Sequence, residues 1–346
     1  MSLSADSDAS GVMMAFVVAT ESDVMVFGAD RGRRKAHGID RPTCLAADSL
    51  QPGRVWCGSD RDGVFVSDDH GDHWRQAGLA GRRIQAIASS PTTPNVVWAG
   101  TEPSEVWRSA DAGVTWERCR GLEALPSSST WSFPPRPHTH HVRWIACHPN
   151  ETGRLWAAIE AGALVSTSDD GATWRDRVAG GPYDTHELAI HRAAPGTLRV
   201  AAGDGYFESH DAGETWTRPR DGLEVGYLRS VAIDPGDPEV VIVSASSGPR
   251  TAYVAGVSDG RLYRRAGGAK WLRVRSGWPD PPSTIAPLLV AGTSDHEFLA
   301  ADERGVHRSD DGGASWQMIT DFPTSPRHLR GLAITQNRGQ SRISWK

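Results

Sequence analysis

Short runs of apolar and β-branched residues recur along the chain, and turns rich in Pro, Gly and Asp separate them. Residues 85–119 contain three such runs, QAIAS, VVWAGT and EVWRSA, and a fourth begins at Thr115. Runs of this length, bounded by turn residues, are typical of strands rather than helices. The pattern therefore predicts an all-β protein built from units of four short strands.

A polar motif close to Ser-x-Asp-x-Gly-x-Thr-Trp recurs near the end of each unit. Neighbouring copies lie about 42 residues apart where no insertion intervenes, which matches the ~40–45 residues of a four-stranded propeller blade. Good copies occupy residues 67–74, 109–116, 167–174, 209–216 and 309–316, and degenerate copies occupy residues 28–35 and 264–271. These seven units predict seven blades.

The two ends of the chain are expected to complete one blade. Residues 16–32 align with residues 55–71 but lack the first strand of a unit, and LRGLAITQ at 329–336 matches the first strand LRSVAIDP at 228–235. A C-terminal strand that joins the N-terminal blade closes the ring and leaves no exposed sheet edge. We therefore predict a single domain, residues 1–346, that forms a seven-bladed β-propeller of four-stranded antiparallel blades.

The repeated motif resembles the Asp box, or BNR repeat, of sialidase-like β-propellers, and the resemblance covers nearly the whole chain. It implies that each box is a hairpin between the third and fourth strands, on the rim opposite the active face. The residue types suit a structural role, since Ser and Asp bind turn amides, Gly adopts positive φ and Trp packs between sheets. We expect the boxes to reinforce the fold rather than to bind ligands.

Composition narrows the range of partners. The chain has 37 basic and 42 acidic residues and a net charge of −5, whereas nucleic-acid-binding domains are usually strongly basic. No apolar run approaches the ~18 residues of a membrane span, and the N-terminus lacks the features of a signal peptide. Four cysteines without a CxxC pair suit reduced thiols. We expect a cytoplasmic protein that binds a small or sugar-like molecule rather than nucleic acid or a membrane, without a nucleotide or flavin cofactor.

Alignment of the units gathers polar residues into two columns on one face of the predicted ring. The first column stands near the start of the first strand and contains Thr43, Gln85, Arg143, His186, Arg229 and Arg330. The second ends the second strand and contains Glu21, Asp60, Glu102, Glu160, Asp204 and Glu303. Charged side chains at the channel mouth need solvent or partners, so the columns indicate either an anion-binding or catalytic funnel or a solvated polar lining. Most of the carboxylates are expected to pair with the arginines.

The stretch PRPHTHHVRW at 135–144 places three histidines on the same face. His186 begins a strand of the next unit, so we expect His141 and His186 to approach each other. With a carboxylate from Glu160, Glu187 or Asp204, such histidines suit Zn²⁺, Fe²⁺, Mn²⁺ or Cu²⁺. The expected metal ligands are His138, His140, His141 and His186. The alternative is a solvated loop that happens to be rich in histidine.

The favoured function is a metal-dependent hydrolase, lyase or related enzyme that acts on a polar or anionic substrate, because a bound metal polarises a substrate or activates water. The expected catalytic residues are Glu160, His186 and Asp204. The residues expected to orient the substrate are Arg143, Arg229, Arg250, Tyr253 and Arg330.

Two other functions stay open. The resemblance to sialidases implies glycoside hydrolysis, with Arg143, Arg229 and Arg330 as a carboxylate clamp and Tyr206 or Tyr253 as the tyrosine. The chain departs from sialidases because it has more blades, lacks an Arg-Ile-Pro segment near its first blade and places these arginines on alternate blades. Paired rim carboxylates still permit glycoside hydrolysis. The third hypothesis is a non-catalytic binding or assembly module, since Asp-box propellers include assembly factors and sorting receptors.

Overall fold

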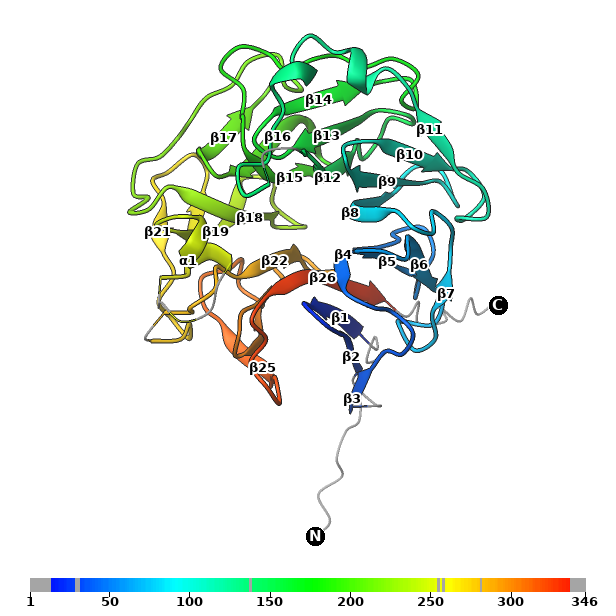
Figure 1. Ribbon diagram of the computed structural model, residues 1–346. Coiled ribbons are helices and arrows are strands. Elements are labelled where there is room, and N and C mark those ends of the chain that lie inside the picture. Colours follow the sequence, from blue (N-terminus) through cyan, green and yellow to red (C-terminus); the bar gives the residue numbers. More distant parts are fainter. Residues whose placement is uncertain are drawn as a thin grey trace, which may run out of the picture.

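The computed structural model describes residues 14–28, 32–136, 139–253, 256, 259–280 and 282–336. These residues form seven antiparallel sheets arranged as a ring around a central channel (Figure 1). The predicted seven-bladed β-propeller is therefore confirmed. In each blade the first strand lies innermost, and Figure 1 shows the later strands progressively farther from the channel.

We number the blades from the sheet that starts at Pro42. Blade 1 contains β4 (Pro42–Ala47), β5 (Val55–Ser59), β6 (Val64–Ser67) and β7 (Arg75–Gln76). Blade 2 contains β8 (Arg83–Ser89), β9 (Val97–Glu102), β10 (Val106–Ser109) and β11 (Glu117–Cys119). Blade 3 contains β12 (Val142–Cys147), β13 (Leu155–Ile159) and β14 (Ala163–Thr167). Blade 4 contains β15 (Thr185–His191), β16 (Ala194–Ala202) and β17 (Gly205–Ser209).

The remaining three blades follow in chain order. Blade 5 contains β18 (Tyr227–Ile233), β19 (Val240–Ser246), β20 (Arg261–Ala266) and β21 (Leu272–Arg273). Blade 6 contains β22 (Leu288–Ala291), β23 (Phe298–Ala301), β24 (Gly305–Ser309) and β25 (Gln317–Asp321). Blade 7 contains β26 (Leu329–Gln336), β1 (Met14–Thr20), β2 (Val24–Gly28) and β3 (Gly32–Lys35).

The ends of the chain close the ring as predicted. Strand β26 pairs antiparallel with β1, with Phe16 opposite Ile334 and Val18 opposite Leu332. Figure 1 shows β26, in red, beside β1, in dark blue. Strand β26 thus covers the inner edge of β1. Left uncovered, that edge could pair with another chain and start aggregation.

The fourth strand is reduced in blades 3 and 4. It consists there of single bridges, Ser166 to Arg175 and Glu208 to Thr217. Pro219 follows soon after Thr217, and a proline cannot donate to a sheet ladder. In blade 3, the Asp176 carboxylate instead accepts hydrogen bonds from the amide and hydroxyl groups of Ser127. The remaining five blades have four strands each.

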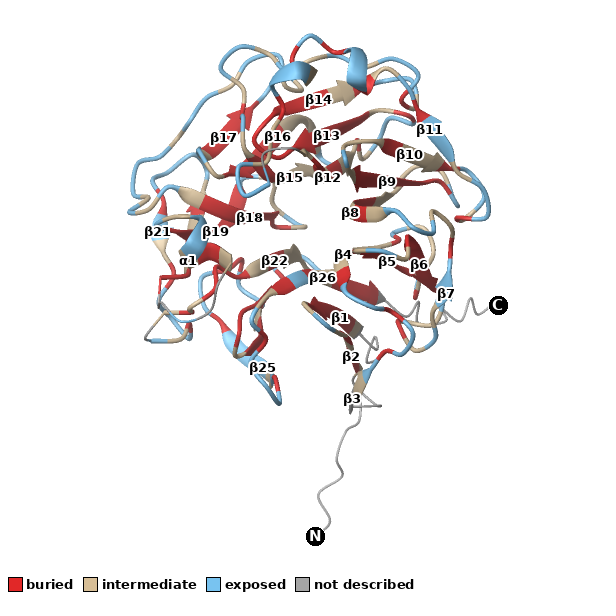
Figure 2. Ribbon diagram, viewed as in Figure 1, coloured by how far each residue is buried: buried red, intermediate tan, exposed pale blue. Residues whose placement is uncertain are grey.

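The middle strands carry the core, and the outer strands face solvent (Figure 2). Every residue of β5 and β13 is buried, whereas both residues of β7 are exposed. Between blades 1 and 2, Trp56 packs in one apolar cluster with Ile84. The helical segments are short: α1 (Pro249–Tyr253) and the 3₁₀ turns η1 (Leu122–Ala124) and η2 (Ser128–Thr130). Among the residues described, none forms a helix long and apolar enough to cross a membrane.

The five good Asp boxes share one hydrogen-bond pattern. In the second box the Ser109 hydroxyl donates to Asp111 at 2.7 Å and accepts from the Gly113 amide at 2.9 Å, and Asp111 also accepts from the Thr115 amide at 2.9 Å. The glycine at this position has a φ of 84°, in the left-handed region that other residues adopt at a cost. The box is thus a self-contained turn. Of the degenerate copies, residues 28–35 lie partly outside the described residues.

Backbone hydrogen bonds place the Asp boxes on one face of the ring. Each box donates to the turn between the first two strands of its own blade, as in His70 N to Gly53 O (2.8 Å) and Ala112 N to Asn95 O (2.9 Å). We call this side the Asp-box face. Turns between second and third strands, and the links between blades, therefore lie on the opposite side, which we call the cavity face.

Candidate functional site

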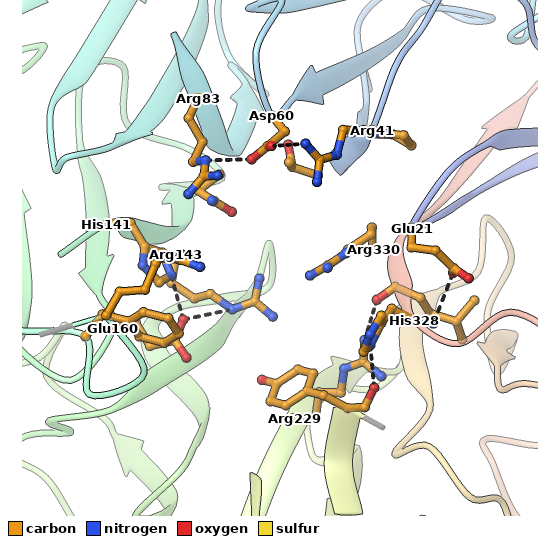
Figure 3. A pocket seen from close by; sticks show the side chains of 17 residues that line it. Glu21, Arg41, Asp60, Arg83, His141, Arg143, Glu160, Arg229, His328 and Arg330 are labelled. Carbon is orange, nitrogen blue, oxygen red and sulfur yellow. Dashed lines mark hydrogen bonds and ion pairs between the residues drawn. The ribbon is translucent and has the colours of Figure 1, made fainter. Parts of the chain in front are cut away.

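A cavity of about 480 Å³ opens at the mouth of the channel on the cavity face (Figure 3). Its lining is unusually rich in charge. The arginines are Arg41, Arg83, Arg136, Arg143, Arg229 and Arg330, and the carboxylates are Glu21, Asp60 and Glu160. Six cations therefore face three anions within one cavity.

Bulges at the start of the innermost strands aim the first column of residues into the channel. In β12, Val142 pairs with Ile159 and Trp144 with Ala158, so Arg143 is an extra residue without an opposite partner. The same register shift occurs in six blades, at Thr43, Gln85, Arg143, His186, Arg229 and Arg330. In blade 6, β22 pairs with β23 without a shift. A bulge re-aims a side chain at the end of a sheet. Five of these six residues line the cavity, whereas His186 is buried behind its wall.

Two of the rim carboxylates, Asp60 and Glu102, pair with arginines that do not belong to the column, contrary to expectation. Glu21 and Glu303 instead accept hydrogen bonds from backbone amides. Asp60 binds Arg83 at 2.5 Å and Arg41 at 3.4 Å. Glu102 accepts two hydrogen bonds from Arg136, at 3.0 and 2.7 Å. Among the described residues, a column arginine pairs with a rim carboxylate once in the cavity, where Arg143 Nε lies 3.5 Å from Glu160 Oε2.

Arg229 and Arg330 have no carboxylate partner among the described residues. Arg229 is buried and donates to the carbonyl oxygens of Ala286 and Leu329, both at 2.6 Å. Burial and the charges of Arg143 and Arg330 lower the pKa of Arg229 to about 10, although Tyr253 opposes this. Arg330 is open to the cavity, and Figure 3 shows it in the middle, without a dashed line to a neighbour. Burial and the charge of Arg143 also lower its pKa.

His141 and His186 approach the same carboxylate from neighbouring blades, as the sequence predicts. His141 Nε2 lies 2.6 Å from Glu160 Oε2, and His186 Nε2 lies 3.8 Å from Glu160 Oε1. All three residues are buried. Burial alone would raise the pKa of Glu160, but the hydrogen bond from His141 and the charge of Arg143 outweigh it and lower the pKa to about 2. Glu160 is therefore ionised and orients the His141 imidazole, whereas the carbonyl oxygen of Leu228 holds that of His186.

Two residues that sequence reasoning missed complete this cluster. Asp184 Oδ2 lies 3.7 Å from His186 Nε2, and the Tyr227 hydroxyl lies 3.3 Å from the same nitrogen. Burial and the charge of Glu160 raise the pKa of Asp184, although His186 opposes this. Asp184 stands two positions before His186 in GPYDTHE, so its closeness to a site histidine was a usable signal. Tyr227 stands at the same repeat position, two residues before the column residue Arg229, so the same signal was available there.

Several expected site residues lie elsewhere. His138 is outside the described residues. His140 packs edge-on against Trp131, with ring centroids 5.6 Å apart, and does not line the cavity. Arg250 is exposed on α1 and Asp204 is exposed between β16 and β17, and neither lines the cavity. Within the described residues, the group placed to hold a metal ion is Glu160, Asp184 and His186 rather than a cluster of histidines.

The two candidate tyrosines separate clearly. Tyr253 lines the cavity, and its ring lies 4.8 Å from the Arg229 guanidinium. Tyr206 is buried away from the cavity and donates to Glu208 at 2.8 Å, within a network that includes Arg199. Tyr206 therefore belongs to the packing between blades and not to the mouth.

The fold is similar to that of several solved propellers. The GH74 xyloglucanase from Xanthomonas campestris has 15% identity to the chain, with coverage of 95% of this chain and 53% of the enzyme and a TM-score of 0.66. An ancestral GH74 enzyme has 17% identity to the chain, with coverage of 90% of this chain and 40% of the enzyme and a TM-score of 0.64. YCF48 from Cyanidioschyzon merolae has 14% identity, with coverage of 93% of this chain and 98% of that chain and a TM-score of 0.58.

These similarities support the fold alone, that of a seven-bladed β-propeller. The chain spans about half of the GH74 chains or less. Neither a family model nor a curated protein sequence matches it.

Proposed function

We propose that this propeller binds a small molecule carrying a carboxylate or phosphate group at the channel mouth, and acts on it as an enzyme. The observation that carries the proposal is the excess of positive charge at the cavity, where six arginines face three lining carboxylates and the rim carboxylate Glu102. Burial and repulsion from Arg143 lower the pKa of both Arg229 and Arg330. An anion among them relieves this repulsion and gains charge-assisted hydrogen bonds.

Arg330 is the residue best placed to bind the anion, because it is open to the cavity and makes no hydrogen bond or ion pair with the described residues. Arg229 already donates to two carbonyl groups, so its role is to support the positive potential. His141, held by ionised Glu160 at 2.6 Å, is the acid–base group at the same wall. A carboxylate that orients an imidazole is a recurrent arrangement for proton transfer.

Calorimetric titration with citrate, glucuronate, glucose 6-phosphate and inorganic phosphate tests the binding step, with glucose as the neutral control. A peptide with a free terminal carboxylate belongs in the panel, because a YCF48 propeller was solved bound to a D1 peptide. We expect at least one anion to bind and Arg330→Gln to weaken it about 10- to 100-fold, the size of a lost charged hydrogen bond.

Arg250→Gln is the matched control, since Arg250 is exposed outside the cavity. Absence of binding by every anion, or equal losses in the two variants, would refute the proposal. For a bound phosphate ester, His141→Gln should abolish turnover while binding persists. Loss of binding with His141→Gln in a correctly folded variant would assign His141 to recognition instead of catalysis.

Glycoside hydrolysis is a second candidate, favoured by the closeness of two carboxylates. Oxygen atoms of Glu160 and Asp184 lie within 4.8 Å of each other, near the ~5–5.5 Å that retaining glycosidases use. Xyloglucan and cello-oligosaccharides are the substrates to test, given the similarity to a GH74 xyloglucanase. Release of reducing sugar that Asp184→Asn abolishes and Asp204→Asn spares would favour this function, and no release by the wild type would exclude these substrates.

A further inference from the structure

Three side chains of ligand type converge behind the wall of the cavity, where blades 3 and 4 meet. His186 Nε2 lies 3.8 Å from Glu160 Oε1 and 3.7 Å from Asp184 Oδ2. One ligand atom from each residue lies within 4.8 Å of the others. Donor atoms around a cation with bonds of ~2.0–2.2 Å are roughly 3.0–3.5 Å apart, so movements of roughly 1 Å or less would close the group around an ion.

Each of the three residues is held by one atom and presents another to the common centre. His186 Nδ1 lies 2.5 Å from the carbonyl oxygen of Leu228, which favours a proton on Nδ1 and a lone pair on Nε2. Asp184 Oδ1 accepts the Ala161 amide at 3.0 Å, which leaves Oδ2. Glu160 Oε2 lies 2.6 Å from His141, which leaves Oε1. Partners of this kind orient ligands in known metal sites.

The balance of charge also favours a cation. Two carboxylates stand beside one buried imidazole, and the nearest arginine contact, from Arg143 at 3.5 Å, is to Glu160 Oε2 on the other side of that carboxylate. Buried carboxylates are stable only when a cation or hydrogen-bond donors compensate them. The Asp184 side chain is 25% exposed, which gives an ion a path from solvent.

We propose that Glu160 Oε1, Asp184 Oδ2 and His186 Nε2 bind one divalent transition-metal cation, with the Tyr227 hydroxyl beside it. Two oxygen ligands and one imidazole suit Zn²⁺ or Mn²⁺, whereas Ca²⁺ and Mg²⁺ prefer oxygen alone. The site shares Glu160 with the anion cavity but does not depend on anion binding.

The test uses full-length protein without a histidine tag, stripped with a chelator and titrated separately with Zn²⁺ and Mn²⁺ by calorimetry. We expect one ion per chain for at least one of the two metals. His186→Ala should weaken binding about 100-fold or more, since loss of a supporting partner alone costs 10- to 100-fold. His191→Ala is the matched control, because His191 lies on the same strand, 2.9 Å from the carbonyl oxygen of Pro235.

Asp184→Asn and Asp204→Asn form a second pair of test and control variants. Only Asp184→Asn should weaken metal binding. Circular dichroism and thermal unfolding verify that each variant folds, and anomalous diffraction at the metal edge locates the ion. No stoichiometric binding of either metal would overturn the proposal, and so would equal losses with His186→Ala and His191→Ala. Arg330→Gln should leave the metal titration unchanged, which separates this site from the anion site.

Discussion

Both faces of the ring carry charged residues at repeated positions of the blades. The two faces differ in where these residues find their hydrogen-bond and ion-pair partners. On the Asp-box face, Asp111 accepts hydrogen bonds from Ser109 and Thr115 of its own hairpin. On the cavity face, Glu160 of blade 3 lies 3.8 Å from His186 of blade 4, and Arg229 of blade 5 donates to the carbonyl oxygens of Ala286, before β22, and Leu329, in β26. The box aspartate is thus satisfied within its own turn, whereas these cavity residues find partners in other blades.

The difference indicates what each face does. A carboxylate that its own turn satisfies can recur in each blade without regard to its neighbours. A cavity needs contributions that differ from blade to blade, so the same column contains Thr43, Gln85, His186 and arginines. Three predictions test this contrast.

The largest effect is expected from Arg229 on the cavity face. Arg229→Met should lower the free energy of unfolding by about 2–4 kcal/mol, because it leaves the carbonyl groups of Ala286 and Leu329 without their donor. Arg330→Met should change it by less than about 0.5 kcal/mol, since Arg330 makes no such bonds within the described part of the chain. Urea unfolding measures both. Equal losses of stability in the two variants would contradict the assignment of a structural role to Arg229 and a binding role to Arg330.

An intermediate effect is expected from Glu187, on the channel wall between the faces. It lines a second cavity of about 750 Å³ toward the other end of the channel, and Ser230 donates to it. Burial raises its pKa from 4.5 to about 8, against the lowering effects of Ser230 and Arg143. A raised pKa stabilises the folded state below 4.5, and this contribution is lost as the pH rises through about 8.

Glu187→Gln should therefore remove a decline in the free energy of unfolding between about pH 5 and about pH 8. Urea unfolding at several pH values within this range measures the slope. Glu117→Gln, at an exposed position of β11, is the control and should leave the slope intact. An unchanged slope in Glu187→Gln would show that this carboxyl group does not titrate in the window.

The smallest effect is expected on the Asp-box face. Hydrogen bonds from Thr115, Thr173 and Thr215 lower the pKa of Asp111, Asp169 and Asp211 from 3.8 to about 2. A lowered pKa stabilises the folded state above 3.8, and the contribution is lost as the pH falls through about 2. Changing all three to Asn should flatten the fall of the thermal midpoint in this acid range. Asp280→Asn, at an exposed site, should not flatten it.

Much of the fold was predictable because the repeat is a local signal. Strand runs, turn residues and motif spacing recur along the chain, and the match of 329–336 with 228–235 indicated ring closure. The alignment also placed Arg143, Glu160 and Arg330 on the cavity face. The loss of a full fourth strand in blades 3 and 4 was not predicted. In blade 3 it accompanies a contact between Asp176 and Ser127, which lie far apart in the sequence.

The site was predictable only in part. His141 and His186 do meet at Glu160, but His140 turns to Trp131 and Asp204 stays exposed. Asp184 and Tyr227 enter the cluster instead. Residue type and repeat position assign a face to a side chain, whereas its partner depends on how two neighbouring blades pack.

The sequence by itself determined the architecture: seven repeated units, closure of the ring by the C-terminal strand, and the face on which each polar column lies. These properties follow from periodicity and local turn chemistry, which each unit carries alone. Only the tertiary structure decided which charges are paired, because bulges at the inner strands and the approach of separate links bring distant residues together. Arg143 and Arg330 belong to the same column, yet Arg143 lies beside Glu160, whereas Arg330 opens to the cavity without an ion pair to any described residue.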